Sequence, residues 1–351
     1  MFIIPKKDGR IRWISDLREL NKVAVRHQYP LPIIGDVLRK SSGYKYFTKL
    51  DFSMQYYTFE LDEASKDLCA IVTPFGKYQY NRLPMGLKCS PDFAQEVMEG
   101  IFSDMEDADV YIDDVGIFSN NWDGHVKVLD TVLQRLQQIG FTINPLKCEW
   151  GVQETVWLGY WLTPTGLKPW KKKIQAVLDM QLPKNLKQLQ GFIGAINYYR
   201  DMWKHRSDIL TPLSSMTSKQ AKWNWDRKCQ QAFDSIKKIV SRETLLSYPN
   251  FNKPFEIHTD ASKLQLGAVI SQEGKPIAFY SRKLNPAQVN YTTTERELLS
   301  IVETLKEFRN ILLGQSIKVY TDHKNLTYKT FNTERVMRWR LILEEYGPEL
   351  I

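Results

Sequence analysis

Apolar and polar residues alternate along residues 108–119, where β-branched and aromatic side chains flank two adjacent acids, Asp113 and Asp114. A period of two indicates a half-buried strand, and Asp is favoured in turns because of its local hydrogen bonds. The segment therefore predicts a β-hairpin with both acids at its corner. Residues 47–53 alternate in the same way up to Asp51, which we expect to end a strand before a turn.

Helical spacing replaces the alternation in two other segments. Residues 83–91 have Pro near both ends and Gly86 between them, which predicts a loop, and the apolar spacing after it predicts a helix. A further helix is predicted with Asn185 as its N-cap. Its core-facing residues are expected to be Leu186, Leu189, Ile193 and Ile196.

A third patterned region follows the turn-rich residues 249–254. Three strand candidates predict a meander, and residues 292–294 are expected to cap a helix before a last strand candidate over 317–322. Three acids mark the ends of these elements: Asp260, Glu297 and Asp322.

The adjacent acids Asp113 and Asp114 would raise one another's pKa unless a cation lay between them. On the dipeptide alone, a solvated Asp-rich turn explains the pattern equally well. With Asp51 on a neighbouring strand, the three carboxylates form a ligand set for two hard cations, which is typical of phosphoryl transfer.

Three motifs together resemble the successive palm motifs of reverse transcriptases: Asp51 with Tyr56, residues 83–91, and residues 111–114. The resemblance is closest to gypsy-type LTR retrotransposons and their retroviral relatives, and it extends over nearly the whole chain. It implies an α+β chain in which a right-hand polymerase fold of fingers, palm and thumb precedes an incomplete RNase H-like α/β domain. The implied activity is RNA-directed DNA polymerisation, with an RNA template, a DNA primer, an RNA–DNA hybrid and dNTPs as partners.

The resemblance also implies roles in the palm and fingers. Asp51, Asp113 and Asp114 would bind two Mg²⁺ ions, with the carbonyl of Phe52 as a further ligand. Tyr56 would be a steric gate against ribonucleotides, whereas without the motif an ordinary core aromatic is the preferred interpretation. Met85, which is Gln in retroviral relatives, would contact the incoming nucleotide. Lys147 would protonate the leaving pyrophosphate. Lys6 and Arg12 would bind the β- and γ-phosphates of the nucleotide. A charged, solvated hairpin is the alternative for the last two.

The expected nucleic-acid contacts lie further along the chain. Residues 157–162, followed by residues 163–166, predict a strand pair with a turn, although the apolar residues could equally be core. The pair resembles the hairpin that grips the primer end and includes Gly159 and Tyr160. The helix after Asn185 resembles the thumb helix that follows the minor groove, with Gln190, Gly194 and Tyr198 on one stripe. A glycine inside a helix costs about 1 kcal/mol relative to Ala. Close approach of either a duplex or a neighbouring helix would explain Gly194.

Beyond residue 250 the chain resembles the RNase H domain, which implies that Asp260, Glu297 and Asp322 bind two further Mg²⁺ ions. Glu295 reads instead as part of a capping box. Relatives continue to a fourth carboxylate, so we expect weak or absent hybrid cleavage. The expected domains are fingers and palm (1–165), thumb and connection (166–250) and the RNase H-like domain (251–351), as one part of a Pol polyprotein.

Composition agrees with a soluble multidomain protein, since 351 residues exceed one ordinary core and 25% of them are charged. The net charge of +8 favours a polyanionic partner, although charge alone is weak support. Four scattered cysteines fit a reducing compartment, and no secretory or membrane segment is visible, which predicts a cytoplasmic location, free or within virus-like particles.

Two other functions compete on the sequence alone. One is a decayed element fragment that binds nucleic acid without catalysis. The other is a host DNA-dependent polymerase, which the RNase H-like segment disfavours because copying DNA leaves no hybrid to degrade.

Overall fold

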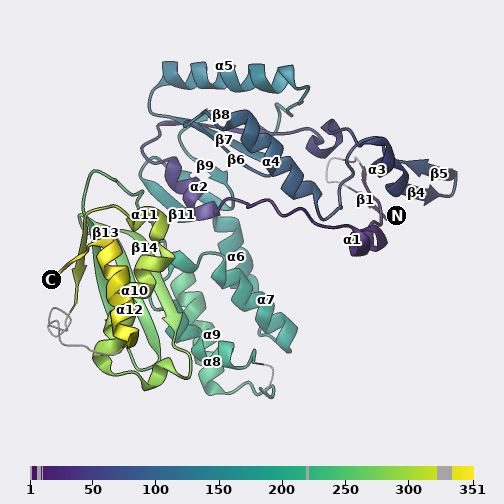
Figure 1. The fold of residues 1–351 in the computed structure, drawn as a ribbon. Helices are drawn as coiled ribbons and strands as arrows, with labels where there is room; N and C mark the ends of the chain where they lie inside the picture. The colour runs from purple at the N-terminus through teal and green to yellow at the C-terminus, as the bar shows by residue number, and fades with distance from the viewer. Residues whose placement is uncertain (1, 6–8, 10, 219–220, 322–333) are drawn as a thin grey trace. The chain divides into compact units, whose positions relative to one another are not determined.

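The computed structural model describes residues 2–5, 9, 11–218, 221–321 and 334–351. The chain forms two compact units, residues 1–158 and residues 159–351 (Figure 1). The expected division at residues 165 and 250 stays a prediction.

The first unit is built on an antiparallel sheet of four strands in the order β6-β7-β3-β8. These strands are β3 (Tyr46–Asp51), β6 (Ala108–Tyr111), β7 (Asp114–Ser119) and β8 (Glu149–Val152). Two helices, α4 (Ser90–Phe102) and α5 (Trp122–Gln138), supply Met98, Phe102, Val132 and Leu136 to a core over the central strands. The alternating sequence pattern thus places one face of the sheet in this core.

The remaining elements of the first unit are short hairpins and helices. They are β1 (Phe2–Pro5), β2 (Ile11–Ile14), α1 (Arg18–Val23), α2 (Ile34–Lys40), η1 (Gln55–Thr58), α3 (Glu63–Leu68), β4 (Ala70–Thr73), β5 (Gly76–Gln79) and β9 (Thr155–Trp157). A small second core joins Leu17, Cys69, Leu83 and Leu87. It lies beneath the 83–91 loop, and α4 starts at Ser90, inside that predicted loop.

The second unit begins with a hairpin and a group of helices. Its elements up to residue 240 are β10 (Tyr160–Thr163), β11 (Gly166–Pro169), α6 (Lys171–Asp179), α7 (Leu186–Asn197), η2 (Arg200–Met202), α8 (Arg206–Ser215) and α9 (Arg227–Val240). The Asn185 side chain accepts a hydrogen bond from the Gln188 N–H, which confirms the predicted cap of α7. Leu186 was expected in the core but is 41% exposed, because it is the first residue of the helix, and Phe192 is buried instead.

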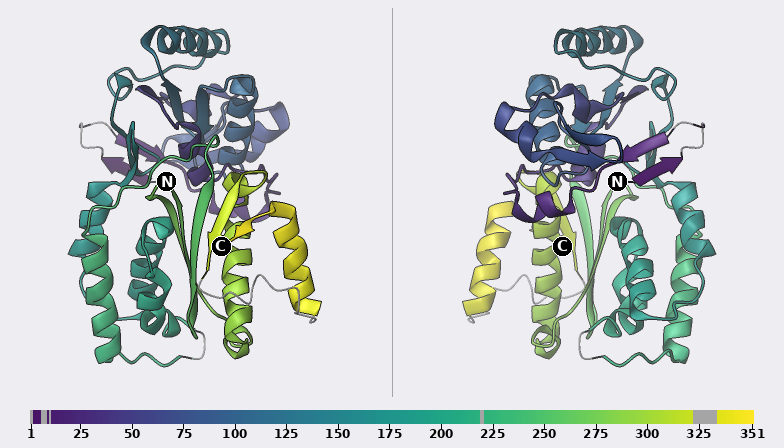
Figure 2. Two further views of the ribbon diagram at one scale, coloured as in Figure 1. Left: turned by 90° about the vertical axis from the view of Figure 1, so that its left-hand side faces the viewer. Right: turned by 90° about the vertical axis from the view of Figure 1, so that its right-hand side faces the viewer.

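A five-stranded sheet forms the rest of the second unit, in the order β14-β13-β12-β15-β16. Its elements are β12 (Phe255–Ala261), β13 (Gln265–Gln272), β14 (Lys275–Lys283), η3 (Gln288–Asn290), α10 (Thr293–Glu307), α11 (Arg309–Leu312), β15 (Ile317–Tyr320), α12 (Glu334–Tyr346) and β16 (Glu349–Leu350). The meander β12–β14 is antiparallel as predicted, and β15 pairs with β12 in parallel. Figure 2 shows α10 and α12 on one face of this sheet and the helices of residues 171–240 on the other.

Within the described ranges, no helix combines the length and apolar character needed to cross a membrane.

Candidate functional site

Three acidic residues lie at one corner of the four-stranded sheet. Asp51 is the last residue of β3 and lies opposite Asp114, the first residue of β7. Tyr111 closes the β6–β7 hairpin opposite Asp114, which leaves Ile112 and Asp113 as a two-residue turn. The predicted hairpin is confirmed, with the correction that Asp114 belongs to the strand and not to the turn.

The charges at this corner disfavour one another. Burial, together with the neighbouring Asp113 and Asp51, raises the pKa of Asp114 from 3.8 to about 6, although Lys49 opposes the rise. Like charges directly opposite each other in a sheet destabilise it. A cation bound here would remove this cost, since carboxylate oxygens are the donors that hard divalent ions prefer.

Lys147 neutralises part of the corner. Its Nζ lies 3.0 and 3.3 Å from the two carboxylate oxygens of Asp51. Among the described residues, no three His, Cys, Asp or Glu side chains already converge as a metal-binding group. The donor set therefore fits a hard cation chemically, while Asp51 is held by a lysine.

The turn itself is held in an unusual backbone conformation by buried amides. Ile112 has a φ of 56°, which is rare for a β-branched residue and costs about 1–3 kcal/mol. Its N–H donates to Oε1 of Gln95 at 2.5 Å, and Gln95 Nε2 donates to the Val110 carbonyl at 3.0 Å. Gln55 Nε2 donates to the Ile112 carbonyl at 3.1 Å. Both glutamines are buried, and neither was found by sequence reasoning because a buried Gln carries no periodic signal.

Tyr56 lies on η1 and packs against the small core of Leu17, Cys69, Leu83 and Leu87. Its burial and the nearby Asp113 raise its pKa. Tyr56 is thus a half-buried aromatic beside the carboxylate corner, and both predicted readings of it fit this position.

The 83–91 loop that contains Met85 is held by a residue that sequence reasoning missed. Asn21 donates to the Gly86 carbonyl at 2.8 Å and accepts from the Lys88 N–H at 2.9 Å. Asn21 lies 65 positions before Gly86, so no local pattern could have indicated the contact. Gly86 has a φ of 105°, a conformation that favours glycine.

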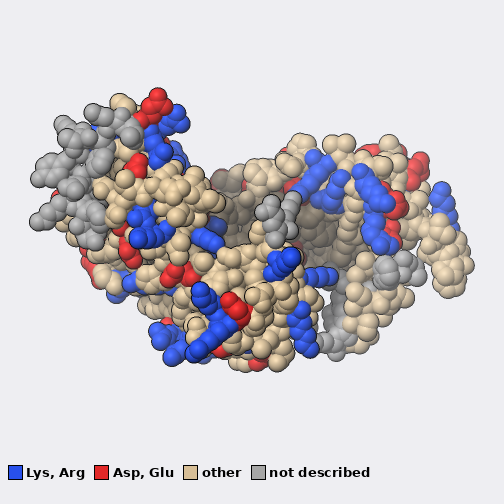
Figure 3. Space-filling model, turned by 90° about the horizontal axis from the view of Figure 1, so that it is seen from below, with Lys and Arg blue, Asp and Glu red and all other residues tan. Residues whose placement is uncertain are grey.

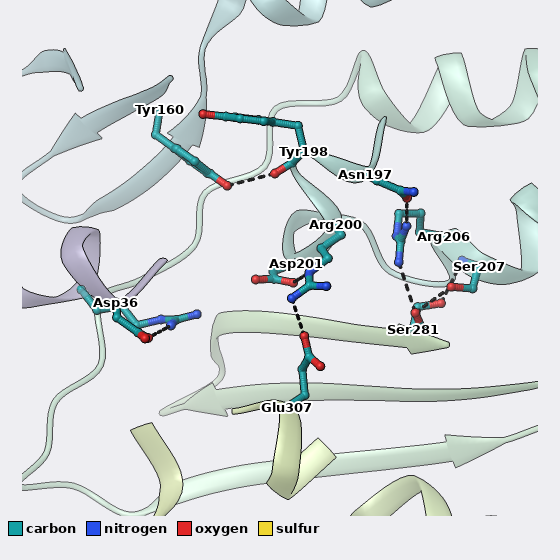
Figure 4. Close-up of polar contacts among 11 residues, drawn as sticks. Asp36, Tyr160, Asn197, Tyr198, Arg200, Asp201, Arg206, Ser207, Ser281 and Glu307 are labelled. Carbon is teal, nitrogen blue, oxygen red and sulfur yellow. Dashed lines mark hydrogen bonds and ion pairs between the residues drawn. The ribbon is translucent and has the colours of Figure 1, made fainter. Parts of the chain in front are cut away.

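Aromatic rings gather around the turn at Gly159 in the second unit. The Tyr160 hydroxyl donates to the Tyr198 carbonyl at 3.2 Å, as Figure 4 shows, and the two rings are 5.8 Å apart. Lys173 Nζ lies 3.5 Å from the centre of the Tyr198 ring, and burial lowers the pKa of this lysine. A Cβ at Gly159, whose φ is 77°, would collide with Tyr198 and Lys173. The structure therefore brings Gly159, Tyr160 and Tyr198 together and adds Lys173.

Gln190 and Gly194 are exposed on α7. A Cβ at Gly194 would meet no described atom within 4 Å beyond its own helix backbone and chain neighbours. No described helix packs at Gly194, so the neighbouring-helix explanation for this glycine is wrong for the described residues.

The second predicted acidic site lies at the end of β12. The Ala261 N–H, directly after Asp260, donates to Oε1 of Glu297 at 3.1 Å, and Glu297 is 3% exposed. Glu295 forms the capping box with Thr292, as predicted. Lys204 and His205 line a cavity of about 150 Å³ together with Asp260, an arrangement that the sequence did not indicate.

Three predicted site residues cannot be placed fully. Lys6 and Asp322 lie outside the described residues, and Arg12 lies in β2 with its side chain outside the description.

Comparison with known sequences matches two regions of the chain to known families. The family described as "Reverse transcriptase (RNA-dependent DNA polymerase)" matches residues 4–162, and "RNase H-like domain found in reverse transcriptase" matches residues 250–346. The chain belongs to the reverse transcriptases. It is 34% identical over 98% of its length to the retrovirus-related Pol polyprotein from transposon 297 of Drosophila melanogaster, and 32% identical over its full length to the transposon Tf2-3 polyprotein of Schizosaccharomyces pombe.

The chain spans only 34% and 27% of the lengths of those two relatives. Two solved structures share its fold at 22% identity. The foamy viral protease-reverse transcriptase with double-stranded DNA has a TM-score of 0.88 over 99% of this chain and 64% of that chain. The same viral protein with an RNA/DNA hybrid has a TM-score of 0.81 over 99% of this chain and 49% of that chain. The predicted right-hand polymerase fold with an RNase H-like domain is thereby confirmed.

One face of the chain carries many basic side chains. Figure 3 shows Lys and Arg spread over the face drawn, with fewer Asp and Glu between them. Such a surface suits a polyanion, in agreement with the net charge of +8.

Proposed function

We propose that this chain is the RNA-directed DNA polymerase of a retrotransposon, which extends a DNA primer on an RNA template. The observation that carries the proposal is the carboxylate corner of Asp51, Asp113 and Asp114 within the region that matches the reverse transcriptase family. Two Mg²⁺ ions bound by these carboxylates and by the Phe52 carbonyl would lower the barrier to attack of the primer 3′-hydroxyl on the α-phosphate of a dNTP.

The residues around the corner bind and orient the substrates. Lys147 lies beside Asp51, within reach of a phosphate held at the carboxylates, and donates a proton to the leaving pyrophosphate. Tyr56 excludes the 2′-hydroxyl of a ribonucleotide by its bulk. Met85 contacts the incoming nucleotide, while Lys6 and Arg12 hold its β- and γ-phosphates.

The second unit holds the duplex and cleaves the hybrid in this proposal. Gly159, Tyr160 and Tyr198 grip the primer end, and Gln190 and Gly194 follow the minor groove. The open space above Gly194 supports a close approach by the duplex. Asp260, Glu297 and Asp322 would hold the metal ions that activate water for hydrolysis of the RNA strand.

A second function has one observation in its favour. Because Asp51 is paired with Lys147 and no described trio of ligands converges, the chain could be an element fragment that binds nucleic acid without catalysis. Primer extension by the full chain with Mg²⁺ and dNTPs decides between the two. Extension that disappears on Asp113→Asn supports the polymerase, while tight hybrid binding without any extension supports the fragment.

The complete element would contain further parts of a Pol polyprotein, which we propose as partners in a cytoplasmic location, free or within virus-like particles. Sedimentation of this chain with particles from cells that express the whole element tests this proposal.

A further inference from the structure

We infer that Gln55 is a specificity-determining residue that fixes the Tyr56 ring relative to the turn carrying Asp113. The inference rests on the proposed polymerase function and adds a positioning role to it. Gln55 is the first residue of η1, and Tyr56 follows it directly.

The hydrogen bond of Gln55 reaches the catalytic turn itself. Its Nε2 donates at 3.1 Å to the carbonyl of Ile112, which belongs to the peptide that joins Ile112 to Asp113. One side chain therefore connects the backbone of the proposed steric gate to the backbone of a proposed metal ligand. These segments lie 57 positions apart in the sequence.

Both ends of this connection are in rarely adopted conformations. Met54, just before Gln55, has a φ of 57°, and Ile112 has a φ of 56°. Neither is a glycine, and such conformations persist only where the surrounding structure holds them. Gln95 holds the N–H of Ile112, and Gln55 holds its carbonyl. The clustering of two such residues around one amide indicates that the connection is a constrained part of the site.

Packing alone does not explain a glutamine here. Gln55 is 4% exposed, and its Oε1 is buried without a hydrogen-bond partner among the described residues. Burying an unpaired amide oxygen is unfavourable, so an apolar side chain of similar size would fill this space at lower cost. Among the described residues, the hydrogen bond that this amide makes is the one to the Ile112 carbonyl.

The consequence concerns sugar selection. A gate excludes a 2′-hydroxyl only if its ring cannot move away from the sugar, whose position is set by the metal-binding turn. With the bond intact, the ring and the turn move as one piece. Without it, the ring can shift, and a ribonucleotide fits more easily.

The test measures kcat/KM for incorporation of dATP and of ATP by the parent chain and by the variants Gln55→Met and Gln55→Leu. Both variants keep the approximate size of the side chain and remove the hydrogen-bond donor. We expect the dATP/ATP ratio to fall about three- to tenfold, the range that loss of one buried hydrogen bond allows. A residue that is only structural would lower both values together and leave the ratio unchanged. Melting temperatures identify a variant that fails to fold. If one of the two variants fails to fold, the other still allows the comparison.

A double-mutant cycle with Tyr56→Ala makes the test specific. Once the ring is removed, Gln55→Met should change the ratio no further. An unchanged ratio in the single variants, or an equal fall in the Tyr56→Ala background, would overturn the inference while leaving the polymerase intact. A parent chain that incorporates neither nucleotide would overturn the proposed function, and the role of Gln55 with it.

Discussion

Replacing Asp114 with Asn should stabilise the metal-free protein while it abolishes activity. The carboxyl of Asp114 has a pKa of about 6 in the folded chain, against 3.8 as its ordinary value, because it is buried and faces Asp113 and Asp51. Each pKa unit corresponds to 1.36 kcal/mol, so the folded state loses at most about 3 kcal/mol at pH 8 by holding this group ionised. Asn has no carboxyl to ionise and avoids this loss.

The sign of the effect follows from proton binding. Between about pH 4 and pH 6 the folded parent binds more protons at Asp114 than the unfolded chain does, so its stability falls as the pH rises through this range. Well below pH 3.8 the group is neutral in both states. The advantage of Asp114→Asn should therefore be largest at pH 8 and vanish toward pH 4.

Urea unfolding in EDTA at pH 4.5 and pH 8 measures this difference. Glu106→Gln, which removes an exposed carboxylate of the same unit, is the matched control and should change stability by less than about 0.5 kcal/mol. Added Mg²⁺ should stabilise the parent more than Asp114→Asn. A variant no more stable than the parent at pH 8, or an advantage equal at both pH values, would refute the electrostatic account of the corner.

Two further substitutions test the roles of single residues. Gly194→Ala should raise the stability of the second unit by about 1 kcal/mol in urea unfolding, because α7 gains a better helix former in open space. The same substitution should weaken hybrid binding, which fluorescence anisotropy measures. An unchanged hybrid affinity would contradict a close approach of the duplex. Lys147→Met should lower the single-turnover incorporation rate by about a hundredfold or more with hybrid affinity retained, as quench-flow would show, and an undiminished rate would remove Lys147 from the chemistry.

Local sequence signals predicted the elements that carry the sites. The hairpin at residues 111–114 follows from alternation and turn residues, and the caps at Asn185 and Thr292 follow from side chains three positions from their partners. Periodicity alone did not predict burial at Leu186. This residue has the helical spacing of the core positions, yet it is exposed because it lies in the first turn of α7.

The contacts that hold the sites in place could not be read in this way. Gln95 contacts a turn 17 positions away, Gln55 one 57 positions away, and Asn21 a loop 65 positions away. Each is a polar residue without periodic spacing, and only the folded chain brings it to its partner. The position of Lys173 over the Tyr198 ring likewise depends on how α6 packs beside the Gly159 turn.

The most direct test of the account is single-nucleotide incorporation on a DNA primer annealed to an RNA template, with Mg²⁺, by the parent chain and by Asp113→Asn. We predict that the parent adds one templated deoxynucleotide and that Asp113→Asn binds the same hybrid without adding it. Incorporation by both proteins, or by neither while the hybrid stays bound, would contradict a polymerase centred on the carboxylate corner.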